Sequence, residues 1–118
     1  HQMISTVEGL VDAEVSLTDI LKATFPMGSM TGAPKIAAMK EIEGLESFKR
    51  GWYSGAVGYV SPNGDFDFNV VIRSILCDMQ SKTLNYNAGG AITIDSDAEN
   101  EWAEVQLKTK AITETLGI

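Results

Sequence analysis

The spacing of apolar residues changes twice along the chain, and this change limits the folds available to it. Between Ser16 and Glu43, apolar residues recur every three or four positions, which is typical of helices. Between Gly55 and Ala91 the spacing falls to two, the period of strands. From Ala98 onward the helical spacing returns. We therefore predict an α+β chain in which helices pack on one face of an antiparallel sheet.

Three predicted helices carry start or stop signals. Ser16 followed by Asp19 predicts a capped helix start. Pro34 suits the first turn of the next helix, and Gly44 is its predicted stop. Residues 96–99 read Ser-Asp-Ala-Glu, a capping-box pattern, and an apolar stripe at helical spacing follows.

Short turns divide the strand region into a predicted meander. Gly55–Val60 and Phe66–Leu76 are predicted strands, joined by a tight Asn-Gly turn at Pro62–Asp65. A reversal at Ser81–Lys82 leads to a third strand at Thr83–Asn87. Residues 1–8 also alternate between β-branched and polar positions, so we predict a further strand there.

Composition excludes several classes of protein. The 118 residues suit one domain or a part of one, and the hydrophobic fraction of 44% predicts a core. Sixteen acidic against nine basic side chains argue against a nucleic-acid surface. No apolar run approaches the ~20 residues of a membrane span, and no signal peptide is visible. Cys77 is the only cysteine, so we expect a reducing, cytoplasmic setting.

The segment Phe25–Lys35 is a loop by composition, and its glycines lead into a predicted helix start. Free amides and the helix dipole favour an anion at such a position. Lys35 follows Gly32 by three residues, so this is not a Walker A loop. A glycine-rich turn without a ligand is the alternative interpretation.

Arg73 lies within an otherwise apolar predicted strand. A guanidinium is rarely buried without a partner, and its fork of donors suits a substrate carboxylate. An arginine paired with a protein carboxylate, or simply solvated, is the alternative. The small residues of Asn87–Ala91 would let a ligand approach backbone amides, although a bulge or sharp bend explains them equally well.

Glu101, Glu104 and Lys108 share one face of the last predicted helix. Carboxylates suit Mg²⁺, which prefers hard oxygen ligands, but Glu104 and Lys108 also form an ordinary i, i+4 pair. His1 has two interpretations, a residue left by cloning or a general acid/base group.

Five ordered segments together resemble the chorismate-utilising enzymes, which include anthranilate synthase component I and the isochorismate and salicylate synthases. The residues of these segments are most similar to those of component I of para-aminobenzoate (aminodeoxychorismate) synthase. The resemblance extends over essentially all 118 residues. The segments are Phe25–Lys35, Arg50–Tyr59, Asp67–Arg73, Ala88–Ile92 with Asp95 and Ser96, and Glu101–Glu104 with Lys108.

The resemblance implies roles for individual residues. It implies that His1 is a catalytic residue near the substrate ring, and that Tyr53 and Arg73 hold the enolpyruvyl carboxylate. The other implied substrate-binding residues are Ser29, Gly89, Gly90 and Lys108. Glu101 and Glu104 match the acidic pair that binds Mg²⁺. Ala91 stands where the family often has a third glycine.

The resemblance also implies a reaction and its partners. The parent enzyme would replace the 4-hydroxyl of chorismate with ammonia from a glutamine amidotransferase subunit, for para-aminobenzoate and folate synthesis. Anthranilate or isochorismate chemistry, and a non-catalytic chorismate-binding fragment, are the alternatives.

Further active-site residues of this family precede the matched segments. We therefore expect residues 1–118 to be the C-terminal part of a larger anthranilate synthase-like domain, inactive alone and prone to self-association through unpaired strand edges. We expect neither a nucleic acid nor a membrane as partner.

Overall fold

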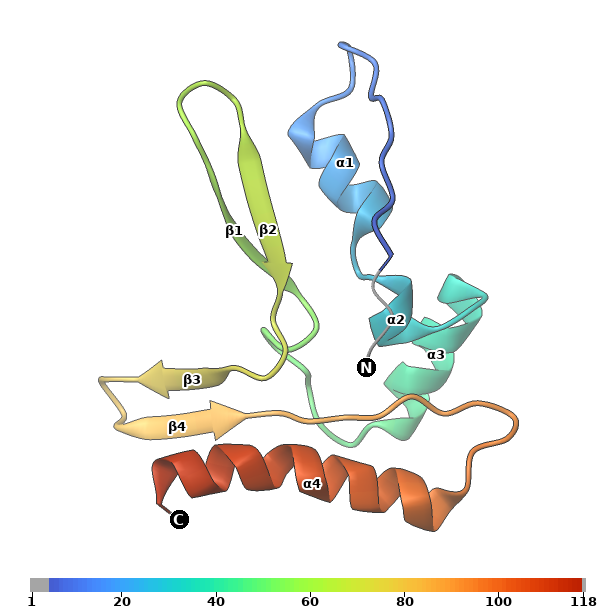
Figure 1. The fold of residues 1–118 in the computed structure, drawn as a ribbon, viewed down its shortest axis with the longest axis vertical. Coiled ribbons are helices and arrows are strands. Elements are labelled where there is room, and N and C mark those ends of the chain that lie inside the picture. Colours follow the sequence, from blue (N-terminus) through green and yellow to red (C-terminus); the bar gives the residue numbers. More distant parts are fainter. Residues whose placement is uncertain (1–4, 118) are drawn as a thin grey trace.

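A computed structural model describes residues 5–117, which form helices and short antiparallel hairpins (Figure 1). The predicted α+β class is confirmed. Residue His1 and most of the strand predicted at residues 1–8 lie outside the described part, and residues 5–8 are not in a strand. The elements are α1 (Leu17–Thr24), α2 (Gly28–Thr31), α3 (Lys35–Leu45), β1 (Ala56–Val60), β2 (Phe66–Val70), β3 (Ile75–Asp78), β4 (Thr83–Tyr86) and α4 (Ala98–Leu116).

The start of α1 is confirmed, whereas the start of α4 differs from the prediction. The Ser16 hydroxyl accepts from the Asp19 amide at 3.2 Å, and the Asp19 carboxylate accepts from the Ser16 amide. At α4 the cap is Asp97, which accepts from the Asn100 amide at 3.0 Å. The predicted Ser96 capping box is therefore wrong. The aspartate one residue later offers a charged acceptor to the free amides.

The predicted loop at Phe25–Lys35 contains the short helix α2. The amides of Met30 and Thr31 both donate to the Met27 carbonyl, at 3.0 and 3.1 Å. Gly32 ends the turn with φ +126°, which a residue with a side chain rarely adopts. Pro34 precedes α3 as its cap instead of standing in the first turn, and α3 ends at Leu45, one residue beyond Gly44.

Strands β1 and β2 form the predicted hairpin, with Ala56 opposite Val70 and Val60 opposite Phe66. Gly64 has φ +92°, as the Asn-Gly turn requires. A Cβ at Gly58 would clash with the Asp67 carbonyl oxygen, so this position admits only glycine.

The single strand predicted at Phe66–Leu76 is wrong, because the chain breaks between β2 and β3. Arg73 has φ +51°, a left-handed conformation that a continuous strand does not allow. Strand pairing continues one step past β2, where the Val71 amide donates to the Gly55 carbonyl at 3.0 Å. Beyond this point β3 pairs with β4, so the strands within residues 5–117 form two separate two-stranded sheets instead of one meander.

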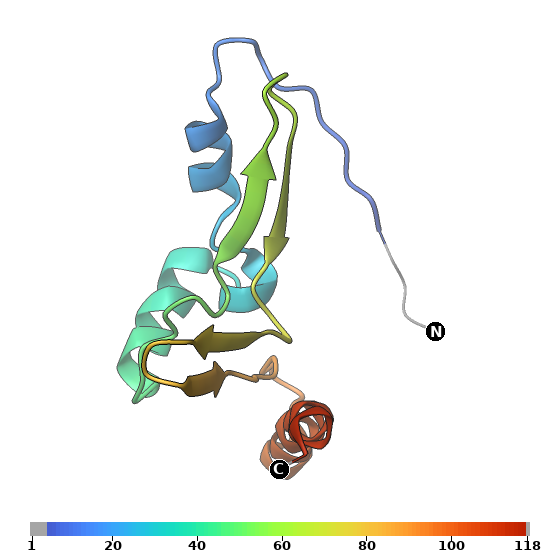
Figure 2. The same ribbon diagram turned by 90° about the vertical axis from the view of Figure 1, so that its left-hand side faces the viewer.

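The arrangement is open. The first hairpin stands beside α1, and the second hairpin runs along the direction of α4 (Figure 1). A view turned by 90° shows α4 nearly end-on below β3 and β4 (Figure 2). The radius of gyration is 17.0 Å, against about 13.5 Å for a compact domain of this length.

The core that composition predicted is not formed by the described residues. The accessible surface is 10197 Å², whereas a compact monomer of this mass exposes about 6,200 Å². Within residues 5–117, Val71 is the one apolar side chain that is buried, and Ile72 beside it is exposed. The apolar residues are therefore left on open faces.

Candidate functional site

A cavity of about 300 Å³ lies between α2, the end of α3, the break after β2, the loop after β4 and α4. It brings together segments that are far apart in the sequence. All six predicted substrate-binding residues line it, namely Ser29, Tyr53, Arg73, Gly89, Gly90 and Lys108.

The loop after β4 passes closely between Tyr53 and α4. A Cβ at Gly89 would lie 2.9 Å from the Tyr53 hydroxyl oxygen. A Cβ at Gly90 would lie 3.3 Å from a carboxylate oxygen of Glu101. The small residues therefore permit a close approach of the backbone on both sides, which the sequence pattern alone left undecided.

Arg73 reaches the cavity from the break between β2 and β3, instead of from within a strand. Its side chain is exposed, and it makes no ion pair within residues 5–117. Of the alternatives for Arg73, pairing with a described carboxylate is excluded. The guanidinium is available to a carboxylate of a ligand.

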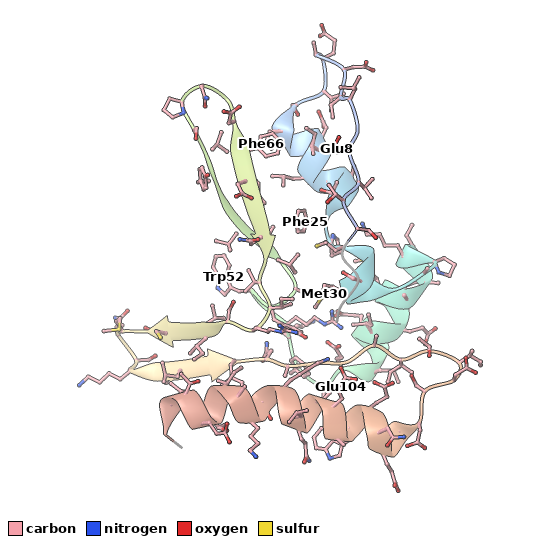
Figure 3. The ribbon with its side chains drawn as sticks, in the orientation of Figure 1. Glu8, Phe25, Met30, Trp52, Phe66 and Glu104 are labelled. Carbon is pink, nitrogen blue, oxygen red and sulfur yellow. The ribbon has the colours of Figure 1, made fainter. Side chains whose placement is uncertain are left out.

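Lys108 is held in place by two contacts. Its ammonium donates to the Gly89 carbonyl at 3.0 Å and pairs with the Glu104 carboxylate at 2.7 Å. Glu104 lies on the side of α4 that faces the preceding loop (Figure 3). The ordinary i, i+4 pair is therefore present, and it also places the lysine at the cavity wall.

Glu101 and Glu104, the predicted metal ligands on α4, already have partners within the chain. The Glu101 carboxylate accepts from the Ser96 hydroxyl at 2.7 Å, and Glu104 is paired with Lys108. No group of three or more His, Cys, Asp or Glu side chains that could hold a metal exists among the described residues. Two carboxylates one helical turn apart still fit Mg²⁺, which commonly takes one or two carboxylates and keeps several waters.

Arg50 and Glu46 also line the cavity, and the sequence analysis missed both. The guanidinium donates two hydrogen bonds to the Glu46 carboxylate, at 2.8 and 2.5 Å. A third goes to the Met30 carbonyl at 2.8 Å. Figure 3 shows Met30 on the side of α2 that faces the centre of the molecule. The i, i+4 spacing of opposite charges was the available signal, but such pairs are common on surfaces.

The pair stays charged over a wide pH range. The hydrogen bonds from Arg50 hold the pKa of Glu46 below its ordinary value of 4.5, although partial burial opposes this shift. The same bonds raise the pKa of Arg50. Among the described residues, the cavity wall carries three cations: Arg50 is paired with Glu46, Lys108 is paired with Glu104, and Arg73 makes no ion pair. This balance favours an anionic ligand.

The anion site predicted at the start of α3 is not part of this cavity. From the glycine-rich segment, the cavity is lined by Ser29 and Met30, which belong to α2. Ile72, Phe48 and Ile112 add apolar walls. The cavity thus suits a small molecule that combines negative charge with apolar atoms. Among the described helices, none is long and apolar enough to cross a membrane.

Comparison with known proteins gives consistent matches. The family described as chorismate binding enzyme matches residues 1–114. The chloroplastic aminodeoxychorismate synthase of Arabidopsis thaliana is 44% identical over 94% of this chain. The aminodeoxychorismate synthase of Streptomyces pristinaespiralis is 44% identical over 93%, and anthranilate synthase component 1 of Acinetobacter calcoaceticus is 40% identical over 93%. The chain spans 12%, 15% and 22% of the lengths of these three relatives, respectively.

Proposed function

This chain belongs to the chorismate-binding enzyme family, and we propose that the full-length protein converts chorismate and ammonia to 4-amino-4-deoxychorismate and water. One observation carries the proposal. The cavity gathers all six substrate-binding residues that the family resemblance implies, with an excess of positive charge. Relatives named aminodeoxychorismate synthase at 44–45% identity support the choice of reaction.

The cavity residues would bind chorismate through its two carboxylates. Arg73 offers a planar fork of donors to the enolpyruvyl carboxylate, and the Tyr53 hydroxyl adds a further hydrogen bond. Lys108 and the backbone amides of Gly89 and Gly90 would hold the ring carboxylate. Because Lys108 is already fixed by the Gly89 carbonyl, little rotamer freedom would be lost on binding. Ser29 would contact the substrate from α2.

The proposal includes Mg²⁺, held by Glu101 and Glu104 together with the substrate. The metal, when bound, would neutralise the ring carboxylate and polarise the substrate as the hydroxyl leaves. Glu101 is already oriented by the Ser96 hydroxyl. Glu104 would have to share its charge between the metal and Lys108.

We also propose that residues 1–118 form part of a larger chorismate-binding domain. Two observations support this. The relatives are several times longer than this chain, and the total accessible surface exceeds that of a compact monomer. Ammonia from a glutamine amidotransferase subunit and a role in folate synthesis belong to the same proposal. The cytoplasmic location stays a prediction, since two plant relatives are named as chloroplastic.

The test is product analysis with the full-length protein. Chorismate, Mg²⁺ and an ammonium salt are incubated with the protein, and the products are separated by chromatography. We expect 4-amino-4-deoxychorismate, and we expect none from residues 1–118 alone. Unchanged chorismate with the full-length protein would contradict the proposed activity, and would favour a non-catalytic chorismate-binding protein if calorimetry detected binding.

Anthranilate synthesis is a second candidate, because relatives named anthranilate synthase component 1 are 39–43% identical over most of the chain. The same chromatogram separates the two reactions, since anthranilate is an aromatic product with its own fluorescence. Anthranilate as the main product would overturn the amination proposal in favour of this candidate.

A further inference from the structure

We propose that Arg50 is a positioning residue that fixes α2 and Tyr53 against each other at the cavity wall. Arg50 is outside the set of residues that the family resemblance brought to the substrate. The kinetic part of its test rests on the proposed function, whereas the structural part does not.

The side chain of Arg50 connects α2 with the residue that follows α3, the next helix along the chain. It donates one hydrogen bond to the carbonyl of Met30, twenty residues earlier, and two to the carboxylate of Glu46, just after α3. Both partners line the cavity, as Ser29 next to Met30 does. The guanidinium therefore holds α2, and with it Ser29, at a fixed distance from the end of α3.

The backbone of Arg50 holds the other side of the cavity. Its carbonyl accepts from the Tyr53 amide at 3.0 Å and from the side-chain amide of Asn87 at 3.4 Å. The guanidinium carbon also lies 5.9 Å from the centre of the Tyr53 ring, within the range of a cation–π contact. The Tyr53 hydroxyl in turn lies against Gly89. One residue thus links four cavity-lining segments.

The neighbouring ion pair offers an internal comparison. Lys49 pairs with Glu43 at 2.8 Å, but their side chains are 87% and 74% exposed. The Arg50 and Glu46 side chains are 23% and 27% exposed. Surface pairs contribute little, whereas a part-buried, bidentate pair with a third hydrogen bond fixes geometry. Lys49 and Glu43 do not line the cavity, so they provide a matched control.

Arg50 also offsets negative charge on the cavity wall, where a ligand would bind. Of the described residues that line the cavity, Glu46 is the one with a carboxylate, and it would repel an anion if it stood alone. The bidentate contact neutralises it, so that Glu46 does not oppose the attraction of Arg73 for the ligand. Replacement of Arg50 by lysine keeps the charge but removes the fork and therefore separates the two effects.

The first experiment is hydrogen exchange by mass spectrometry on the full-length protein without ligand. The Arg50→Met variant is compared with Lys49→Met and the wild type. We expect the amides of residues 30–32 and of Tyr53 to exchange about tenfold faster in Arg50→Met, the factor that follows from losing one charge-assisted hydrogen bond. Lys49→Met should exchange like the wild type. If Arg50→Met does not fold, Arg50→Lys takes its place with the same expectation.

The second experiment is a double-mutant cycle with chorismate on Arg50→Lys, Tyr53→Phe and the combined variant. We expect Arg50→Lys to raise KM about tenfold, and we expect the combined variant to lose less than the product of the two single effects. A purely structural role would lower the melting temperature and leave the two KM effects independent.

The outcomes separate the two proposals. Wild-type exchange rates in Arg50→Met and Arg50→Lys, or independent KM effects, would overturn the positioning role. A wild-type protein that neither binds nor converts chorismate would overturn the proposed function, and the exchange data would then still decide the role of Arg50.

Discussion

The substitution Arg73→Lys tests the proposed contact between Arg73 and the enolpyruvyl carboxylate, here called the carboxylate clamp, without changing the backbone. Arg73 lies in the left-handed region at φ +51°, where lysine and arginine meet the same steric cost. It makes no ion pair within the described residues, so no internal contact is lost on replacement. The change therefore alters only what the head group can offer to a ligand.

The expected magnitude follows from the hydrogen bonds that the two head groups can make. A guanidinium can donate two parallel bonds to one carboxylate, whereas an ammonium acts as a point charge and keeps about one. A hydrogen bond to a charged group contributes roughly 1.5–3 kcal/mol. Loss of about 1.5 kcal/mol corresponds to about a tenfold weaker affinity.

Steady-state kinetics of the full-length protein provide the measurement. We expect KM for chorismate to rise about tenfold while kcat changes little, because the carboxylate contact is present in both the ground state and the transition state. Lys110→Arg on α4 is the control, since Lys110 pairs with Glu114 and does not line the cavity. A KM for Arg73→Lys within about twofold of the wild-type value would refute the clamp.

Three further predictions concern the metal, the ion pair and the hairpin. Glu104→Gln should raise the Mg²⁺ concentration needed for half-maximal activity by at least about tenfold, because a neutral amide is a poorer ligand, and unchanged metal dependence would exclude Glu104 as a ligand. Glu46→Gln should lower the melting temperature most above pH 4.5, and this difference should shrink below pH 4.5 and vanish once the pH falls below the depressed pKa of Glu46, where the carboxylate is protonated in the folded protein too. A pH-independent difference would contradict this origin. Gly58→Ala should destabilise the full-length protein by about 2 kcal/mol or more, since the new Cβ meets the Asp67 carbonyl, and an unchanged melting curve would disprove the close approach.

Local signals predicted local structure well. The Ser16 cap, the Asn-Gly turn ending in Gly64 and the long C-terminal helix all depend on residues close in sequence, and all three are present. The position of the α4 cap was wrong by one residue, because the Ser96 hydroxyl contacts the Thr93 amide and the Glu101 carboxylate, and Asp97 caps the helix. The short helix α2 was missed for a similar reason, since a four-residue turn has no periodicity to detect.

The break at Arg73 could not be predicted from pattern. Residues 66–76 are mostly β-branched or apolar and carry neither glycine nor proline, the usual signs of a break. The positive φ of Arg73 is a property of the folded chain, and it is also what turns this side chain toward the cavity. A local rule of strand formation is therefore violated at a residue of the candidate site.

The candidate site depends on contacts between distant segments. Composition and spacing indicated which residue types could bind an anion or a metal. The grouping of Ser29, Tyr53, Arg73 and Lys108 into one site was implied by the family resemblance, and all four line the cavity. Arg50 was missed because its signal, an acidic residue four positions earlier, is shared by many surface pairs. Its partial burial and its contacts with the Met30 carbonyl and the Tyr53 ring distinguish it in the structure.

The most direct test of the account is a crystal structure of the full-length protein with chorismate and Mg²⁺. We predict that the ligand occupies the cavity between α2 and α4, with one carboxylate within hydrogen-bond distance of Arg73 and the other near Lys108 and the Gly89 amide. The Arg50–Glu46 pair should be unchanged beside it. Chorismate bound elsewhere, with Arg73 and Lys108 both without ligand contacts, would contradict the assignment of the site.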